Sequence, residues 1–276
     1  MVSNFARIFY FVIALILAAC SNESNTVSET AEIAEAANET IASVPKYSAE
    51  AFFATTSYGI VGSSAHAFSA DGNSLLISSD NAGVFNAYSL PLDGGKPSQL
   101  TMSDDNAIFA VSWFPNDDRI LYTYDGGGNE LNHVVVREID GSNRDLTPGD
   151  AVKASFVGWN SDGNSFYLLT TERNEQSFDL YRYSSDGYDR ELIYENPGFQ
   201  VSALSRDGRW LALDKPRTSA DSDIYVVDLS TGEKEPLLIT EHSGNVAFGT
   251  YDFTPDNRAV IYATDEHGEF SQAWRH

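Results

Sequence analysis

Five histidines and a series of Asp-Gly pairs are the residues of this sequence best suited to catalysis or metal binding. The histidines lie far apart along the chain, and no run of acidic ligands like that of an EF-hand accompanies any Asp-Gly pair. Asp and Gly at such positions are typical of tight turns, because both residues tolerate positive φ. We therefore expect no metal site and no cofactor. The histidines are His66, His133, His242, His267 and His276.

Sequence motifs that would supply a catalytic group are absent. The chain has no G-x-S-x-G nucleophile elbow, no HExxH, no Walker loop and no CxxC. The most unusual loop is Asp125–Glu130, which contains three consecutive glycines. It is either a flexible connection or a place where the backbone closely approaches a ligand or a neighbouring domain. No catalytic residue is expected in this chain, and no binding residue can be named.

Cys20 is the one residue for which the sequence predicts a chemical modification. A basic residue, Arg7, precedes the apolar run Ile8–Leu17, which is too short to span a bilayer. Leu17-Ala18-Ala19-Cys20 resembles the bacterial lipobox, in which the cysteine becomes the mature N-terminus and carries lipid. Residues 1–20 are thus predicted to be a lipoprotein signal peptide, with the membrane as a partner through lipid at Cys20.

The residue after Cys20 bears on location. It is Ser21, and lipoproteins without Asp at this position usually go to the outer membrane. We expect a cell-envelope lipoprotein of the outer membrane that faces the periplasm or the exterior. Cys20 is the only cysteine, so no intramolecular disulfide is expected, and stability must come from the core.

Residues 21–48 have the composition of a disordered acidic tether. They are rich in Ser, Asn, Thr, Ala and Glu, and such a segment buries too little apolar surface to offset the entropy lost on ordering. The whole chain has a formal net charge of −23. This charge argues against nucleic acid as a partner and against binding to anionic lipid through surface charge.

A hydrophobic turn pattern recurs along residues 49–276. The Asp residues of successive copies are 46, 45, 45 and 49 residues apart, and a period of 40–50 residues made of short strands is typical of a β-propeller. An ordinary β-sandwich has frequent turns but no repeated four-strand unit. The copies are Phe68–Gly72, Phe114–Asp118, Trp159–Gly163, Leu204–Gly208 and Phe253–Asn257.

The third copy shows the expected blade. Four β-prone runs are separated by turns or polar loops, and their hydrophobicity falls toward the last run, as in the antiparallel blade of a propeller. The predicted strands lie at 155–159, 165–171, 178–183 and 190–194. We therefore predict an all-β fold, a β-propeller of which about four and a half blades are present.

The fifth copy is incomplete. After its second predicted strand, Val260–Tyr262, only the start of a third follows, at Phe270–Trp274. We interpret the chain as a truncated propeller. Alternatively, Phe52–Thr56 could act as a donor strand that completes part of the last blade.

Two segments give the chain a family resemblance. Ser78–Tyr88 is similar to the first-blade segment of the S9 serine peptidases, the prolyl oligopeptidase group, and Asp125–Glu130 with His133 resembles the next blade of these proteins. Phe68–Gly72 resembles the WD40-like repeat that this family shares with TolB.

The resemblance implies a propeller that caps a C-terminal α/β-hydrolase domain and restricts entry to small peptides. The family's Ser, Asp and His triad lies in that hydrolase domain, which this chain lacks, so the chain alone is expected to be inactive. The alternative is a TolB-like lipoprotein that binds protein partners in the cell envelope. A G-x-S-x-G motif encoded downstream of His276 would favour the peptidase.

Overall fold

A computed structural model describes residues 44–276 of the chain, which divides into two units, Met1–Ala54 and Thr55–His276. The described part of the first unit contains one short helix, α2 (Ala49–Phe53), whose first turn is capped by Ser48. The Ser48 hydroxyl accepts a hydrogen bond from the Ala51 amide at 3.1 Å. The predicted signal peptide, Cys20 and most of the tether lie outside the described residues. Over residues 44–276, no helix is long and apolar enough to cross a membrane.

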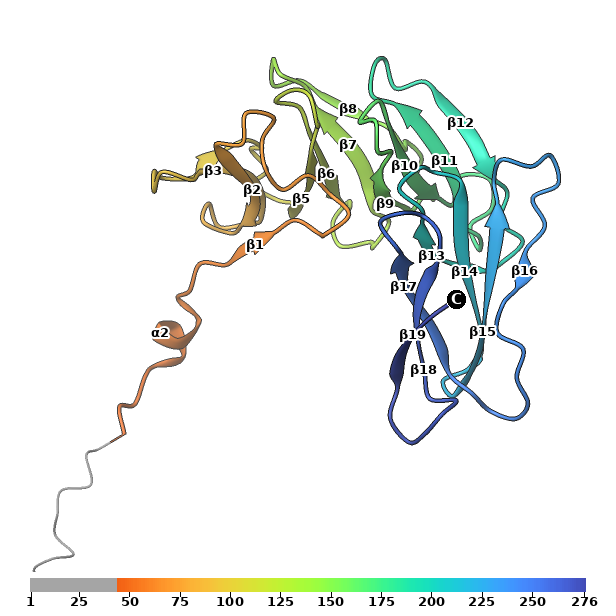
Figure 1. Ribbon diagram of the computed structural model, residues 1–276. Helices are drawn as coiled ribbons and strands as arrows, with labels where there is room; N and C mark the ends of the chain where they lie inside the picture. The colour runs from red at the N-terminus through yellow and green to blue at the C-terminus, as the bar shows by residue number, and fades with distance from the viewer. Residues whose placement is uncertain (1–43) are drawn as a thin grey trace, which may run out of the picture. The chain divides into compact units, whose positions relative to one another are not determined.

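The second unit consists of five antiparallel sheets that follow one another along the chain (Figure 1). The first contains β1 (Tyr58–Ile60), β2 (Ser74–Ser79), β3 (Asn86–Pro91) and β4 (Ser98–Gln99). The second contains β5 (Ile108–Trp113), β6 (Ile120–Tyr124), β7 (His133–Arg137) and β8 (Asn143–Asp145). The third contains β9 (Ala154–Trp159), β10 (Ser165–Thr170), β11 (Asp179–Ser184) and β12 (Arg190–Tyr194).

The fourth sheet contains β13 (Gln200–Leu204), β14 (Trp210–Thr218), β15 (Asp221–Asp228) and β16 (Leu237–Leu238). The fifth has three strands, β17 (Phe248–Phe253), β18 (Val260–Thr264) and β19 (Gln272–Arg275). In every sheet each strand pairs with the next one in sequence, which confirms the predicted all-β fold of successive propeller blades.

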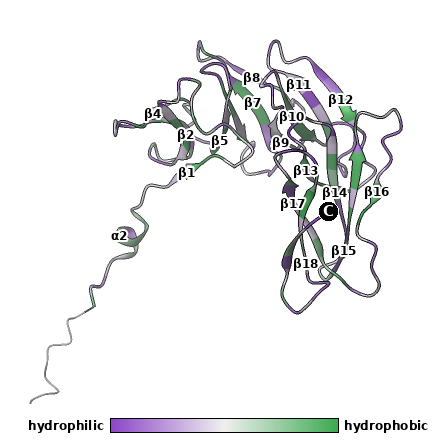
Figure 2. Ribbon diagram, viewed as in Figure 1, coloured by the Kyte–Doolittle hydropathy of each residue, from purple (hydrophilic) through white to green (hydrophobic). Residues whose placement is uncertain are grey.

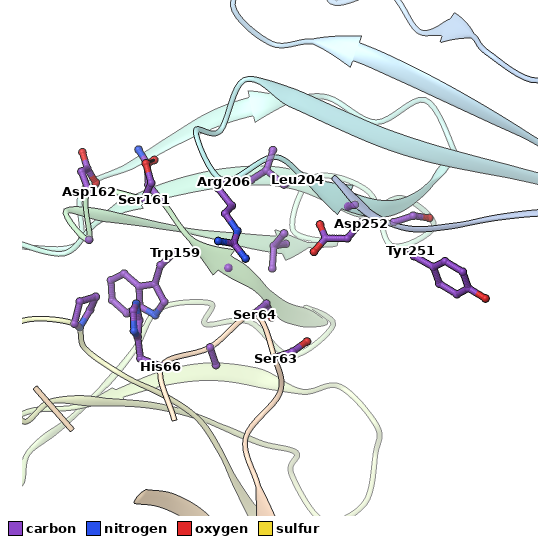
Figure 3. A pocket seen from close by; sticks show the side chains of 18 of the residues that line it. Ser63, Ser64, His66, Trp159, Ser161, Asp162, Leu204, Arg206, Tyr251 and Asp252 are labelled. Atoms are coloured by element: carbon purple, nitrogen blue, oxygen red, sulfur yellow. Dashed lines mark hydrogen bonds between the residues drawn. The ribbon is translucent and has the colours of Figure 1, made fainter. Parts of the chain in front are cut away.

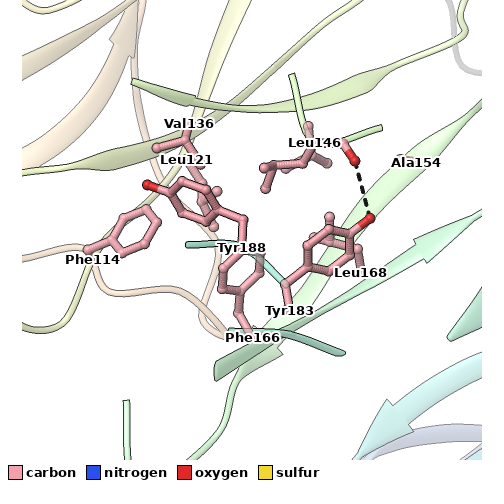
Figure 4. Close-up of a cluster of buried hydrophobic side chains, with 10 residues drawn as sticks. Phe114, Leu121, Val136, Leu146, Ala154, Phe166, Leu168, Tyr183 and Tyr188 are labelled. Atoms are coloured by element: carbon pink, nitrogen blue, oxygen red, sulfur yellow. Dashed lines mark hydrogen bonds between the residues drawn. The ribbon is translucent and has the colours of Figure 1, made fainter. Parts of the chain in front are cut away.

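The hydrophobic core lies in layers between neighbouring blades. The second strands of the first four blades each contain at least three buried residues, while the connecting loops are mostly hydrophilic (Figure 2). One cluster joins the second and third blades and contains Phe114, Leu121, Phe166 and Tyr183 (Figure 4). Further clusters join the first blade to the second, the third to the fourth and the fourth to the fifth. Each blade is therefore stabilised mainly by its neighbours.

Strand pairing aligns the five repeats and corrects one position of the predicted pattern. In the second to fifth repeats the last residue of the first strand pairs with the residue seven positions later, at the start of the second strand. Phe68 of the first repeat pairs with Leu75 at the same spacing. By this criterion Trp113, and not Phe114, is the equivalent of Trp159 in the next repeat. We call these equivalent positions the anchor residues: Phe68, Trp113, Trp159, Leu204 and Phe253.

The segment proposed as a donor strand for the last blade is not a strand. Residues 49–53 form α2, and Phe52 and Phe53 are exposed. The nearest strand, β1, pairs with β2 in the first blade, with Ile60 opposite Ile77. Within the described residues β1 therefore completes the first blade.

The recurring Asp residues are turn residues, as predicted. Each accepts a hydrogen bond from the backbone amide two residues later, as Asp71 does from Asn73 at 3.0 Å and Asp162 from Asn164 at 2.8 Å. The Ser69 hydroxyl also donates to Asp71 at 2.6 Å, and these bonds lower the pKa of Asp71 to about 2. The carboxylates thus bind their own turns.

Gly208 occupies the tightest of these turns. Its φ is +71°, and a Cβ at this position would overlap the Tyr167 side chain of the third blade. We expect Gly208→Ala to lower the free energy of unfolding by about 2 kcal/mol, because positive φ and overpacking both add cost. Urea denaturation would measure the change. The matched control is Gly72→Ala, since Gly72 has φ +72° but open space around it; equal losses in both variants would contradict the role of Tyr167.

Candidate functional site

The first strands of the second, third, fourth and fifth blades carry the same irregularity. In β5, β9, β13 and β17 the register shifts at one residue, so that this residue has no partner on the neighbouring strand. Such bulges bend a strand and redirect a side chain. The bulged residues all lie two positions before the anchor: Val111, Val157, Ser202 and Tyr251.

The first strands of the third, fourth and fifth blades, β9, β13 and β17, line a hollow of about 720 Å³. Three bulged residues, Val157, Ser202 and Tyr251, line it, together with His66, which lies two positions before Phe68 in the first blade. Figure 3 shows the hollow and the side chains around it. Four blades therefore present equivalent positions to one space, so that residues distant in sequence form a single site.

One buried hydroxyl holds three blades together beside this hollow. Ser112, which is fully buried, accepts hydrogen bonds from the His66 amide at 2.9 Å and from the Trp159 indole at 2.8 Å. The His66 and Trp159 rings lie 5.9 Å apart, and burial lowers the pKa of His66. The imidazole is therefore favoured in its neutral form, and the Trp159 ring is fixed as a wall of the hollow.

Two charged side chains in the hollow break the pattern of the repeat. The position before the anchor is small in the first four blades, with Ala67, Ser112, Gly158 and Ala203, but it is Asp252 in the fifth. The position two after the anchor is Ala70, Pro115, Ser161 and Pro255 in four blades, but it is Arg206 in the fourth. Both Arg206 and Asp252 line the hollow.

The backbone of Arg206 is held from both sides. Its carbonyl accepts a hydrogen bond from the Ser161 amide of the third blade at 2.9 Å. Its amide donates to the Asn257 side chain of the fifth blade at 3.0 Å. Because three blades determine its position, the Arg206 side chain projects from a fixed base toward the hollow, facing the same space as the Asp252 carboxylate (Figure 3).

No sequence motif singles out Arg206, Asp252 or Tyr251. The signal that finds them is a comparison of the repeats position by position, in which a charged residue replaces a small or uncharged one. That comparison needs the alignment of Trp113 with Trp159, which strand pairing supplies.

The five histidines do not come together. His66 lies in the hollow, His133 contacts Asp145 at 2.7 Å, and the ring of His267 lies 4.4 Å from that of Trp274. His276 pairs through its backbone with Val260. Across residues 44–276, no group of three or more His, Cys, Asp or Glu side chains is arranged to hold a metal ion.

The glycine-rich loop Asp125–Glu130 connects β6 and β7 and lies outside the hollow. Gly127 and Gly128 have positive φ, which explains why glycine is needed there. The Gly127 amide donates to the Asn106 side chain at 2.8 Å, and the Glu130 amide donates to Asp125 at 3.1 Å. The loop is thus held by a hydrogen bond within itself and by one to the connection between β4 and β5.

His242, in the connection between β16 and β17, forms a charged cluster with residues of the long β14–β15 hairpin of the fourth blade. Its Nε2 is 3.0 Å from Asp221 and its Nδ1 is 3.4 Å from Asp223, while Arg217 pairs with both carboxylates. The hydrogen bond with Asp221 raises the pKa of His242, and the bond from Arg217 lowers the pKa of Asp221. The other neighbours are the Arg217 guanidinium, 3.0 Å from Nε2, the Thr240 carbonyl at 3.1 Å and the Phe248 ring.

This cluster predicts a pH dependence of stability. Because the pKa of His242 is raised in the folded protein, its protonation contributes stability that is fully present below about pH 6.5 and is lost as the pH rises through the pKa of the folded state. Because the pKa of Asp221 is lowered, its ionisation contributes stability that is lost as the pH falls below about 4. We expect the thermal midpoint of His242→Asn to lie below that of wild type at pH 5.5, and the gap to narrow at pH 8.5. His267→Asn, an exposed histidine, should show no such change; a constant gap for His242→Asn would refute the prediction.

The fold and the hollow define a β-propeller domain in which the first strands of the third, fourth and fifth blades line one hollow. Residues 97–246, more than half of the chain, match the family model for the N-terminal β-propeller domain of prolyl oligopeptidase. The chain belongs to this family.

Similar proteins agree with this fold. A TolB homologue from Chlorobium luteolum is 28% identical over 189 residues, covering 61% of this chain and 40% of the homologue. An oligogalacturonate lyase structure from Vibrio parahaemolyticus has a TM-score of 0.58 at 17% identity, covering 80% of this chain and 63% of that one.

The structure of prolyl oligopeptidase B from Galerina marginata, bound to a 35mer substrate, has a TM-score of 0.55 at 10% identity. The match covers 78% of this chain and 32% of that one. These structural likenesses show the fold alone. The chain spans about 40% of the length of the curated relative that it matches.

Proposed function

We propose that this chain is the propeller part of a lipid-anchored S9 serine peptidase, in which the hollow controls peptide access to a C-terminal α/β-hydrolase domain. The observation that carries the proposal is the family match over residues 97–246, which include the second, third and fourth blades and most of the hollow's wall. The chain supplies the entrance in this proposal, and the hydrolase domain supplies the nucleophile.

The geometry of the hollow supports passage of a short peptide. Its volume of about 720 Å³ falls within the range of about 300–1,000 Å³ usual for small-molecule sites. Hydroxyls of Ser64 and Ser202 and the ring of Trp159 offer polar and aromatic contacts to a peptide backbone and its side chains. A flexible, extended peptide fits such a space better than a folded protein does.

The downstream reading frame tests the peptidase proposal. We expect it to continue past His276 into an α/β-hydrolase sequence with a G-x-S-x-G motif, and the full-length product to react with a fluorophosphonate probe. The 276-residue chain should not turn over chromogenic dipeptides. A downstream frame without a hydrolase sequence would overturn the proposal.

The second candidate is a TolB-like module that binds a protein partner in the cell envelope. The 28% identity to the TolB homologue over 189 residues favours it. It predicts that the purified chain captures a specific envelope protein while the downstream frame encodes no hydrolase. The two candidates share the propeller and differ in what lies beyond it.

Both candidates include anchoring of the protein to the cell envelope through Cys20, a residue outside the described part of the chain. We expect cells supplied with an alkyne fatty acid to label the wild-type protein, and the protein to fractionate with membranes. Cys20→Ser should abolish the label, and Ser21→Ala should retain it. Equal labelling of wild type and Cys20→Ser would remove the anchor from the proposal.

A further inference from the structure

We propose that Arg206 and Asp252 form a specificity subsite in the hollow, where Arg206 binds the C-terminal carboxylate of a short peptide and Asp252 repels additional carboxylates. The inference rests on the proposed function in one respect, which is that peptides enter the hollow. It adds which peptides are favoured and which two side chains select them.

The repeat provides the first argument. A propeller blade needs a small residue before the anchor, since four blades have Ala, Ser, Gly or Ala there, and it needs no charge two positions after the anchor. Arg206 and Asp252 therefore add nothing that the blade requires. They lie on adjacent blades and face the same space, so both charges act on whatever occupies the hollow.

The state of the Arg206 guanidinium provides the second argument. Six other arginines form ion pairs with carboxylates: Arg119, Arg173, Arg182, Arg190, Arg209 and Arg217. In the described chain, no ion pair or side-chain hydrogen bond occupies the guanidinium of Arg206, although the protein carries a large excess of acidic residues. Its base is nevertheless held by Ser161 and Asn257. A guanidinium with free donors, carried on a backbone that neighbouring blades hold, is suited to bidentate binding of a carboxylate.

Asp252 determines which carboxylate ligands are accepted. It forms no ion pair with Arg206 within the described residues, and its Oδ1 accepts only the adjacent Phe253 amide, at 2.7 Å. Its negative charge lies beside Arg206 in a protein of net charge −23, so a peptide with several carboxylates is repelled while one carboxylate is bound by Arg206. The subsite thus favours peptides with a free C-terminus and few acidic side chains.

Isothermal titration calorimetry tests the subsite with three peptides and the purified protein. The probes are acetyl-Ala-Ala-Tyr with a free carboxylate, the same peptide as its C-terminal amide, and acetyl-Glu-Glu-Tyr with a free carboxylate. We expect the amide to bind about tenfold more weakly than the free acid, as the loss of a solvent-accessible charged hydrogen-bond pair predicts. The peptide with two Glu residues should also bind more weakly.

Variants assign the two roles. Arg206→Gln should abolish the preference for the free acid over the amide, and Arg206→Lys should restore part of it. Asp252→Asn should strengthen binding of the peptide with two Glu residues. The matched control is Arg258→Gln, which removes an exposed arginine of the fifth blade that does not line the hollow; it should leave all three affinities unchanged.

The outcomes separate the subsite from the proposed function. If the acid and the amide bind wild type equally well, the subsite is wrong while peptide entry stands. If no peptide binds wild type, both the subsite and peptide entry into this hollow are wrong. If Arg258→Gln changes the affinities as much as Arg206→Gln does, the effect is one of net charge, and the subsite is again refuted.

Discussion

Replacing Phe166 by alanine should lower the free energy of unfolding by about 4 kcal/mol, the largest effect we expect from a single substitution. Phe166 is fully buried in β10, between the second and third blades. Its ring stacks on Tyr183 at 5.5 Å and lies 5.1 Å from Trp159 and 6.0 Å from Phe114. Truncation to alanine removes these contacts and leaves a cavity, which costs about 3–5 kcal/mol for a buried phenylalanine.

Urea denaturation followed by tryptophan fluorescence would measure this change, because Trp159 is a direct neighbour of Phe166. Phe166→Leu, which keeps much of the volume, should lose about 1.5 kcal/mol and serves if the alanine variant does not fold. The control is Phe270→Ala, since Phe270 is 77% exposed and should change stability by less than about 0.5 kcal/mol. Similar losses at Phe166 and Phe270 would show that this layer is not packed as described.

Replacing Arg119 by methionine should cost about 3 kcal/mol, because Arg119 joins two blades and its side chain is only 17% exposed. The guanidinium donates to Asp117 of its own turn at 2.7 Å. It also donates to the Tyr188 hydroxyl at 2.7 Å and to the Ser185 carbonyl at 2.9 Å, both in the third blade. It lies 4.1 Å above the Phe114 ring, which adds a cation–π contact.

Arg209 is a matched control for Arg119, because each arginine follows the Asp of its turn by two residues. Arg209 pairs with Asp228 but is 51% exposed and bonds within its own blade. Exposed pairs of this kind contribute about 0–1 kcal/mol, so Arg209→Met should have a small effect in the same urea titration. A loss at Arg209 as large as that at Arg119 would contradict the importance of the contact between blades.

The all-β fold and its division into blades could be predicted from the sequence, because strand and turn preferences act over a few residues and recur with the repeat. The Asp turns and the second and third strands predicted for the third repeat lie within a few residues of their structural bounds. The first error was the choice of Phe114 as an anchor. Phe114 and Trp113 are adjacent and both buried, and composition cannot tell which of two neighbouring aromatic residues pairs with Ile120.

The second difference concerns Phe52–Thr56, a β-prone run that forms no strand. Ser48 caps a helix over residues 49–53, and a local cap outweighs the strand preference of two phenylalanines that have no sheet to join. Strand propensity largely reflects burial against neighbours, and these side chains are exposed.

The linear order of residues was enough to define the repeat, the expected turns, the acidic charge and the predicted lipid site at Cys20. Only the tertiary structure brought Arg206, Asp252, Trp159 and His66 around one hollow, and only it showed that Ser112 and Arg119 link different blades. The physical reason is that strand formation depends on neighbours along the chain, whereas the hollow depends on packing between blades about 45 residues apart. It also depends on the bulges in β9, β13 and β17, each of which redirects one side chain.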